Sequence, residues 1–225
     1  ADILSHKIIS ESLEKLTPNI PILSEESVNI PLEERMDWVE YWLVDPLDGT
    51  KEFIKKNGEF TTNIALMRFN RPVFGIIHAP ARSETFWGAE EIGGFLLNGE
   101  CEHEAKRITA KCPNDSKIRI VSSRSHPSSG LKSILDEIDD YDLVKIGSSL
   151  KFCKFATGEA DCYPRLGPTC EWDIAAGEII ALSAGAITTD SKGNKMAYNY
   201  KKDFLNPSFL VSNDDKTHKK ILALI

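Results

Sequence analysis

Several features that define other protein classes are missing from this sequence of 225 residues. No apolar run approaches the roughly 20 residues that cross a bilayer, and the opening ADILSHKIIS lacks the charged, apolar and small-residue regions of a signal peptide. We therefore expect a cytoplasmic protein with no integral membrane segment. Because the first residue is Ala1 and not Met, we also expect native residues to precede it.

The sequence also lacks a basic excess and a cysteine motif. Lys and Arg number 27 against 34 Asp and Glu, for a formal net charge of −7, which argues against nucleic acid as a partner. A small anionic substrate then needs a local cation, from clustered side chains or from a metal. The five cysteines are an odd number without CxxC or zinc-ligand spacing, as is typical of reduced thiols: Cys101, Cys112, Cys153, Cys162 and Cys170.

The length allows one large domain or two small ones, and the first half reads as α+β. Apolar residues recur at helical spacing over 3–16, which predicts one amphipathic helix that Thr17-Pro18 ends. IPILSEES and YWLV are short apolar runs that predict buried strands with acids at their ends. A hairpin around 70–72 and strands near 84–88 and 94–98 complete an antiparallel half.

A polar segment over 111–117 precedes an apolar strand, IRIVSS, and then helices predicted over 129–137, 148–158 and 173–184 alternate with strands. We place a domain boundary in this segment. The predicted units are an N-terminal metal-binding domain over 1–115 and a C-terminal α/β substrate-specificity domain over 116–225. No internal repeat or low-complexity tract argues for a solenoid or a disordered tail.

The strongest local signal is DPLDGT at positions 45–50. Two carboxylates three positions apart, held by Pro and Gly at a strand end, direct Asp45, Asp48 and the carbonyl of Leu47 to one point. Hard divalent cations prefer such oxygen ligands. The alternative is an ordinary turn in which Asp48 or Thr50 caps a helix over KEFIKK.

Two further segments with acidic residues can each be interpreted in two ways. Glu25 and Glu26 end an apolar strand, where a buried carboxylate needs a cation, yet a solvated strand end is an equally good explanation. Asp173 opens the small-residue helix of WDIAAGEII, where Asp is also a favoured N-cap. Trp172 beside it is more typical of a core residue than of a cofactor contact.

The three segments together resemble the inositol monophosphatase superfamily of metal-dependent phosphatases. SEES, DPLDGT and WDIAAG appear in the order of that family's signature and span nearly the whole chain. YWLVDPLDGTKEFIKKNGEFTTNIAL, IGSSLKFCKFATGEADCYPRLGPT and FLNPSF resemble its 3'(2'),5'-bisphosphate nucleotidases more specifically. The resemblance implies an α/β layered sandwich (αβαβα, inositol monophosphatase/sugar phosphatase-like), with an antiparallel-sheet N-terminal domain and a mixed α/β C-terminal domain.

The resemblance also implies the metal ligands. Glu25, Asp45 and the Leu47 carbonyl correspond to ligands of one Mg²⁺, and Asp45, Asp48 and Asp173 to those of a second. A third, largely water-ligated ion lies near the Glu25 position in such enzymes, so two to three Mg²⁺ ions are expected. Thr50 corresponds to the residue that orients the attacking water, and Asp2 to the acid that partners it, with Glu25 as a further catalytic residue. Inhibition by Li⁺ and, in the family, a peripheral position on the cytoplasmic side of the inner membrane are also implied.

The implied reaction is hydrolysis of the 3'-phosphate of adenosine 3',5'-bisphosphate to AMP by metal-activated water, with its sulfated relative as another candidate substrate. The amides of Gly49 and Thr50 stand where a helix should begin, which favours the transferred phosphate, and Asp173 also lies on the substrate side. Metals, rather than a basic surface, then collect the anion.

Substrate choice is expected to depend on the second half. The resemblance assigns the nucleotide's other phosphate to three residues: Ser148, Lys151 and Arg165. They offer it a hydroxyl, an ammonium and a guanidinium that can bind two phosphate oxygens at once. Their alternatives are a helix cap for Ser148, a solvated lysine for Lys151 and an ion pair with Glu171 for Arg165. His126 in SSRSH also corresponds to a substrate-side position, although a lone His is as often structural.

Other functional classes fit less well. LDGT resembles the nucleophile loop of haloacid dehalogenase-type phosphatases, but that loop needs two acids two positions apart, and here they are three apart. A non-enzymatic anion-binding module would be favoured if one of the four acids, Glu25, Asp45, Asp48 or Asp173, were replaced, and none is. Within the superfamily, inositol phosphate or fructose 1,6-bisphosphate hydrolysis remains the alternative, because the metal motifs are shared.

Overall fold

Strands account for most of the N-terminal half of the chain. The computed structural model describes residues 1–111, 117–124 and 129–225. Its first sheet has the strand order β1-β2-β3-β4-β5-β6-β7, so spatial order follows chain order. Only β1 is parallel to its neighbour, and the other pairs are antiparallel. The strands are β1 (Ile22–Ser24), β2 (Glu40–Asp48), β3 (Thr61–Arg68), β4 (Arg71–Ala79), β5 (Glu84–Ala89), β6 (Gly93–Asn98) and β7 (Lys106–Ile108).

The second sheet is mixed and its order departs from chain order. Its strands run β11-β12-β10-β8-β9, with β8, β9 and β10 parallel and β12 antiparallel to both of its neighbours. Parallel neighbours need crossover connections, and helices supply them here. The strands are β8 (Ile118–Ser123), β9 (Tyr141–Ile146), β10 (Cys162–Arg165), β11 (Ile187–Asp190) and β12 (Phe209–Ser212).

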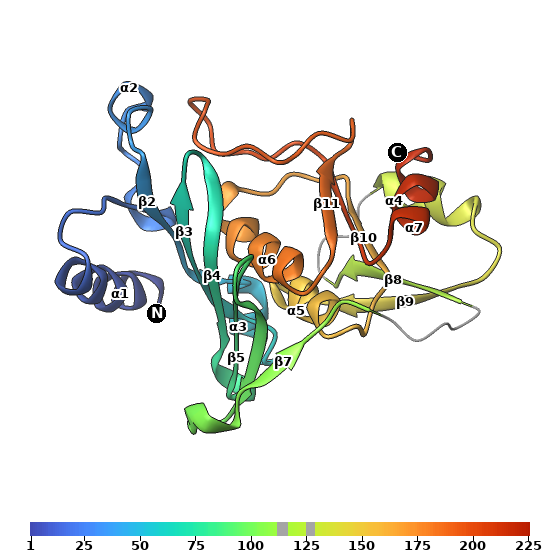
Figure 1. Cartoon of the computed structure of the whole chain (residues 1–225), viewed down its shortest axis with the longest axis horizontal. Coiled ribbons are helices and arrows are strands. Elements are labelled where there is room, and N and C mark those ends of the chain that lie inside the picture. The colour runs from blue at the N-terminus through green and yellow to red at the C-terminus, as the bar shows by residue number, and fades with distance from the viewer. Residues whose placement is uncertain (112–116, 125–128) are drawn as a thin grey trace.

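Helices separate and cover the two sheets, which makes five layers (Figure 1). The middle layer is α6 (Glu171–Ser183), which packs against the first sheet, with α5 (Leu150–Ala156) beside it against the second. The outer layers are α1 (Asp2–Leu16) on one side and α4 (Ser129–Asp136) with α7 (Asp215–Leu222) on the other. The short helices are α2 (Leu32–Arg35), α3 (Thr50–Lys55), η1 (Glu25–Ser27), η2 (Pro80–Arg82) and η3 (Glu102–Glu104). The predicted αβαβα sandwich is confirmed.

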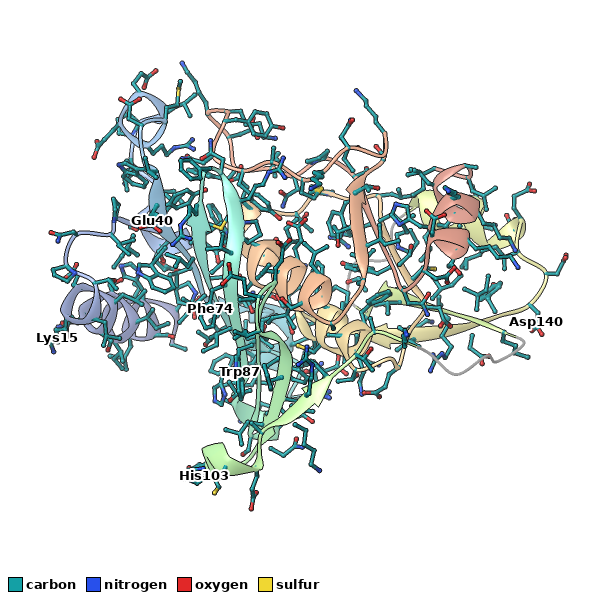
Figure 2. All side chains as sticks on the ribbon, viewed as in Figure 1. Lys15, Glu40, Phe74, Trp87, His103 and Asp140 are labelled. Carbon is teal, nitrogen blue, oxygen red and sulfur yellow. The ribbon has the colours of Figure 1, made fainter. Side chains whose placement is uncertain are left out.

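The main core fills the space around α6. One cluster of buried apolar side chains joins the inner face of the first sheet, α5, α6 and part of the second sheet. A smaller cluster lies under α4 and α7. Lys15 on α1 and Asp140 before β9 lie at opposite ends of the stack, outside both clusters (Figure 2). The carboxylate cluster lies near the middle layer and not at an end of the stack.

Most of the predicted elements are present, with differences at their ends. The hairpin turns at Phe69 and Asn70, both at positive φ, so the strand resumes at Arg71 and not after Pro72. The predicted helix over 3–16 forms, but the prediction that it is amphipathic, with one buried apolar face, is wrong. Leu13 is its only buried residue, and Ile3 is 74% exposed. The reason is that the contacts of α1 with the sheet fall mainly on β1 and β2, at one edge.

The division into two domains stays a prediction, because the boundary between 115 and 116 falls outside the described residues. Within the described ranges, no helix is both long enough and apolar enough to span a membrane.

Candidate active site

Three carboxylates meet beside the middle layer. Asp45, Asp48 and Asp173 each offer an oxygen, and these oxygens lie within 4.8 Å of one another. Asp45 and Asp48 come from the end of β2, and Asp173 comes from the first turn of α6. The predicted convergence of DPLDGT with WDIAAG is therefore present in the structure.

An irregularity in β2 makes the convergence possible. Residues three apart on a regular strand point to opposite faces. The β2–β3 register shifts between Asp45 and Asp48, and the amide of Leu47 donates a 3.0 Å hydrogen bond to Asp45 Oδ1. Gly49 then adopts φ 86°, which L side chains rarely tolerate. The Pro and Gly of the motif thus bend the strand so that both acids face one point.

The acids and Thr50 do not occupy the helix N-cap positions that the alternatives gave them. The N-cap of α3 is Gly49, and neither Asp48 nor Thr50 takes that position. Asp173 is not an N-cap either: α6 begins one residue after Cys170, and Asp173 accepts a 2.8 Å hydrogen bond from the Cys170 amide. Its carboxylate therefore closes the helix start and still reaches the cluster.

Burial and mutual repulsion make these acids hard to ionise. Asp45 is 1% exposed, and burial, followed by the charges of Asp48 and Glu25, raises its pKa well above the ordinary value. Burial and the Asp48 charge raise the pKa of Asp173 to about 7. None of the ion pairs among the described residues includes an acid of this cluster.

Glu25 and Asp2 border the cluster. Glu25 opens η1 directly after β1, and its side chain hydrogen-bonds with that of Asp45. Burial raises the pKa of Glu25, and the charges of Asp48 and Asp2 add to the effect. The hydroxyl of Ser5 donates a 2.9 Å hydrogen bond to the Pro46 carbonyl, which ties the first turn of α1 to the motif.

The donor set suits a hard divalent cation. All the side chains are carboxylates, they are close together, and none of them forms an ion pair with a cation among the described residues. A divalent cation would relieve the repulsion that raises the pKa values of Asp45 and Asp173. The residues present therefore fit a metal such as Mg²⁺.

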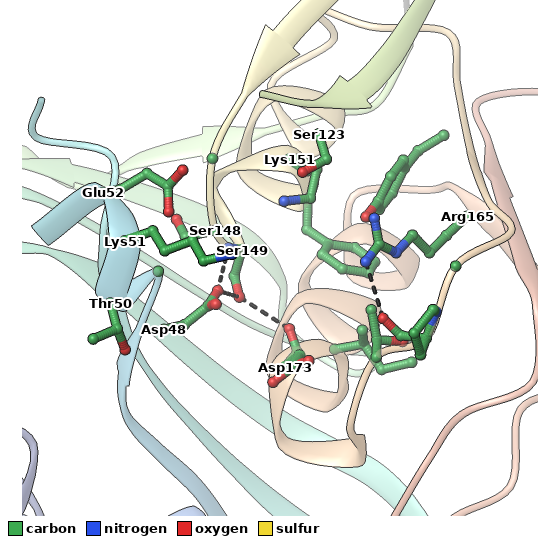
Figure 3. A pocket seen from close by; sticks show the side chains of 18 residues that line it. Asp48, Thr50, Lys51, Glu52, Ser123, Ser148, Ser149, Lys151, Arg165 and Asp173 are labelled. Carbon is green, nitrogen blue, oxygen red and sulfur yellow. Dashed lines mark hydrogen bonds between the residues drawn. The ribbon is translucent and has the colours of Figure 1, made fainter. Parts of the chain in front are cut away.

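A pocket of about 610 Å³ opens from this cluster (Figure 3). Asp48, Gly49 and Thr50 line one side, and Lys151 and Arg165 lie on the side away from Thr50. Burial lowers the pKa of the Lys151 amine, as does the charge of Arg165, while the charge of Asp48 opposes the shift. Lys151 is therefore a half-buried pocket cation and not the solvated helix lysine of the alternative.

The other substrate-side residues also fall at the pocket. Ser148 is buried, at φ 46°, and lines it. Its hydroxyl accepts only a long hydrogen bond, 3.4 Å, from the Leu150 amide, and the N-cap of α5 is Ser149. Arg165 donates to the Pro168 carbonyl at 3.0 Å. His126 lies outside the described residues.

Glu171, the alternative partner of Arg165, is held elsewhere. It is 1% exposed, and its two carboxylate oxygens each accept from the Asn199 amide at 3.0 Å. Asn199 in turn hydrogen-bonds the buried Arg35. This buried network fastens the segment before β12 to the start of α6.

Sequence reasoning missed a second group of polar residues, of which Ser149 lines the pocket. Ser149, Asn63 and Glu59 are buried and hydrogen-bonded between the two halves of the chain. Ser149 lies 101 positions from Asp48, whose carboxylate it contacts. No local pattern signals a partner that far away, so only the folded structure identifies these residues.

Comparison with known proteins shows what the whole chain is similar to. The model of the inositol monophosphatase family matches residues 1–225. The 3'(2'),5'-bisphosphate nucleotidase CysQ of Salmonella typhimurium is 46% identical over 212 residues, which are 94% of this chain and 83% of the relative. The protein of the same name from Haemophilus influenzae is 38% identical over 216 residues, 95% of this chain and 79% of the relative.

Solved structures give the same result. The crystal structure of CysQ from Bacteroides thetaiotaomicron has a TM-score of 0.80 at 35% identity and covers 91% of this chain and 81% of that one. The Thermotoga maritima IMPase, at 23% identity and a TM-score of 0.77, shares the fold over 99% of this chain and 80% of its own. The chain belongs to the inositol monophosphatase family.

Proposed function

We propose that this chain is a Mg²⁺-dependent 3'(2'),5'-bisphosphate nucleotidase that removes the 3'-phosphate of adenosine 3',5'-bisphosphate to give AMP. The observation that carries the proposal is one pocket with carboxylates at one side and two cations, Lys151 and Arg165, at the other. A substrate with two phosphates can use both sides. The relatives named 3'(2'),5'-bisphosphate nucleotidase, at up to 46% identity, support the same activity.

The carboxylates are proposed to hold the metal ions. Glu25, Asp45 and the Leu47 carbonyl would hold one Mg²⁺, and Asp45, Asp48 and Asp173 would hold a second, with a third ion near Glu25. When bound, Mg²⁺ lowers the pKa of water and neutralises charge on the phosphate. Asp45 would serve both ions because it is the most buried acid of the cluster and neighbours both Glu25 and Asp48.

The hydrolytic step is proposed to depend on side chains at the motif. Thr50, exposed at the first position of α3, orients the attacking water. Asp2 and Glu25 are proposed to lie beside the same water. The charge of Asp2 acts on Glu25, which indicates that the two acids are near each other. The backbone of Gly49 lines the pocket beside Thr50 and allows close approach of the reacting phosphate.

The other phosphate is proposed to bind Ser148, Lys151 and Arg165. An ammonium and a planar guanidinium suit a phosphate dianion, and partial burial strengthens their interaction with it. Binding energy at this remote group then orients the 3'-phosphate at the carboxylate side. The contribution of His126 stays a prediction, as does the cytoplasmic location.

Hydrolysis of inositol phosphates or fructose 1,6-bisphosphate is less well supported. The carboxylate cluster serves any phosphate ester, so it does not separate these substrates. Lys151 and Arg165 disfavour an inositol monophosphate, which has no second phosphate to bring near them. Fructose 1,6-bisphosphate does have one, and against it the support for the nucleotide is the similarity to 3'(2'),5'-bisphosphate nucleotidases. The inositol monophosphatase structures with 22% and 23% identity share the fold alone.

Phosphate release across a substrate panel tests the proposal. Adenosine 3',5'-bisphosphate, its 5'-phosphosulfate relative, inositol 1-phosphate and fructose 1,6-bisphosphate are compared with and without Mg²⁺. We expect the highest kcat/KM for the two nucleotides and no turnover after chelation. Preferred turnover of inositol 1-phosphate would contradict the substrate assignment, and turnover without a divalent cation would contradict the metal assignment.

A further inference from the structure

Ser149 lies where the two halves of the site meet. Its backbone amide and its hydroxyl both donate to Asp48 Oδ2, at 2.5 and 2.6 Å, and the hydroxyl oxygen lies 2.9 Å from the Asp173 carbonyl (Figure 3). Asn63 on β3 donates a 2.6 Å hydrogen bond to the same hydroxyl. One serine thus contacts a carboxylate from β2, a carbonyl from α6 and an amide from β3.

These contacts fix which oxygen of Asp48 is available. Every hydrogen bond that the described residues give this carboxylate goes to Oδ2, including a long one of 3.5 Å from Thr61. A hydroxyl has one hydrogen, so while Ser149 donates to Asp48 it accepts from Asn63, and the two bonds reinforce each other. Oδ1 receives none of these hydrogen bonds and is left for a cation.

The backbone holds Ser149 in this position. The residue before it, Ser148, adopts φ 46°, a conformation that non-glycine residues rarely take. One residue further back, the Gly147 amide donates a 2.7 Å hydrogen bond to Glu59 Oε2. Two carboxylates from the N-terminal half, Glu59 before β3 and Asp48 at the end of β2, therefore anchor the two ends of the 147–149 turn, and the turn lines the pocket.

We propose that Ser149 and Asn63 are positioning residues that orient Asp48 for divalent-cation binding, an inference that rests on the proposed metal role of Asp48. Ser149 touches neither the reacting atoms nor the cation in this scheme. It acts by holding Oδ2, so that Asp48 need not reorganise when the cation arrives. Because Ser149 belongs to the turn that contains Ser148, it also joins the second-phosphate side of the pocket to the carboxylate side.

Calorimetric titration of the nucleotide-free protein with Mn²⁺ tests this role apart from catalysis. We expect Ser149→Ala to bind Mn²⁺ about tenfold more weakly than the unmodified protein, the lower end of the loss seen when a partner of a metal ligand is removed. Asn63→Ala, which leaves Ser149 in place, should weaken binding in the same direction. The double variant should bind no more weakly than Ser149→Ala, because the pair acts as one unit.

Ser212→Ala is the matched control. Ser212 is also fully buried and hydrogen-bonded, to His218, but lies outside the site, so its loss should leave Mn²⁺ affinity unchanged. Thermal melts of all four variants establish that each is folded. Unchanged Mn²⁺ affinity in a folded Ser149→Ala protein would overturn the proposal, as would full additivity of the two substitutions.

Kinetics separate this inference from the proposed activity. If Ser149 orients Asp48, the Ser149→Ala enzyme should need about tenfold more Mg²⁺ for half-maximal rate and should recover most of kcat at saturating Mg²⁺. Failure of the unmodified protein to hydrolyse bisphosphates, with Mn²⁺ affinity still lowered by Ser149→Ala, would reject the substrate and retain the positioning role. Hydrolysis of bisphosphates by the unmodified protein, with Mn²⁺ affinity unchanged in Ser149→Ala, would retain the substrate and reject the positioning role.

Discussion

Carboxylates in this molecule behave in two opposite ways, according to what surrounds them. Backbone amides and side chains donate to Asp190 and Asp214, and despite some burial their pKa values fall below the ordinary value. At the site, burial and neighbouring acids raise the pKa of Asp45 and Asp173 instead. The surface acids stabilise turns and a helix start, whereas the charge of Lys151 only partly offsets the burial and repulsion of Asp173 at the site.

Asp48→Asn tests the ligand assignment at the level of one atom. Asn retains the shape and can still accept from Ser149, but it loses the charge that a hard cation prefers. We expect turnover of adenosine 3',5'-bisphosphate to fall by at least about 100-fold, since even partners of metal ligands cost 10- to 100-fold. Asp37→Asn, an exposed acid after α2, is the control. Near-normal turnover of Asp48→Asn at saturating Mg²⁺ would count against the assignment.

Arg165→Ala tests specificity. If Arg165 holds the phosphate that does not react, its loss should cost about 1.5 to 3 kcal/mol of transition-state stabilisation for the nucleotide, as for hydrogen bonds to charged groups. Inositol 1-phosphate has no phosphate at that position and should change little. The comparison is made in kcat/KM with both substrates. Equal losses would mean that Arg165 supports the fold or the carboxylate side.

At the scale of elements, the middle layer depends on small residues where helices touch. Gly177 on α6 faces the ring of Phe152 on α5, and a Cβ there would lie 2.4 Å from the ring. Gly75 on β4 is similarly close to α6, at 2.5 Å from Ile179. These approaches let α6 lie against the first sheet and against α5 at once, which places Asp173 beside Asp48.

Gly177→Ala should therefore destabilise the fold. Helix propensity favours Ala by about 1 kcal/mol, but overpacking a buried contact typically costs about 1 to 3 kcal/mol, and the ring of Phe152 is 2% exposed with little room to move. We expect a net fall of about 1 kcal/mol or more in the free energy of unfolding by urea. Gly167→Ala is the control, because its Cβ would meet nothing nearer than Arg165 at 3.8 Å. Equal stability of the two variants would refute the packing argument.

Element prediction from the sequence succeeded where the signal was local. Two β-rich runs on either side of residues 70–72 predicted the hairpin of β3 and β4, and Thr17-Pro18 marked the end of α1. Burial was less predictable, because Ile3 and Leu16 are apolar at helical spacing yet exposed at the edge of the sheet. The layer order came from the family resemblance, since periodicity does not say which face of a sheet a helix covers.

For the site, the motifs predicted the acids but not the residues that orient them. Asp45, Asp48 and Asp173 stand in recognisable segments, and the structure brings them together. Ser149 and Asn63 carry no pattern, because their importance depends on a turn that meets β2 and β3 only after folding. The roles assigned to Thr50, Asp2 and the second-phosphate residues stay predictions.

For the molecule as a whole, metal binding should be linked to pH. Burial and repulsion raise the pKa of Asp173 to about 7, and those of Asp45 and Glu25 also rise, so below this pH the folded site holds protons that a cation must displace. Lowering the pH by one unit should therefore weaken Mg²⁺ binding about tenfold for each proton that the cation displaces. In the metal-free protein, these raised pKa values make the fold less stable as pH rises from about 4 through about 7.

Thermal unfolding measures both effects. A fixed Mg²⁺ concentration should raise Tm more at pH 8 than at pH 6, because fewer protons compete at the higher pH. Asp48→Asn should reduce the Mg²⁺-dependent increase at both values. An equal or larger increase at pH 6 would contradict the linkage.

The strand order of the first sheet has a consequence for how the protein is made. Its seven strands pair in the order in which they are synthesised, and each antiparallel pair joins neighbours along the chain, so this sheet can form from local contacts. The second sheet must wait, because β8 pairs with β10 and β12 lies between β10 and β11. Asp45 and Asp48 therefore leave the ribosome well before α6 emerges with Asp173. The moment at which a refolding or nascent chain first captures a divalent cation should mark the docking of α6.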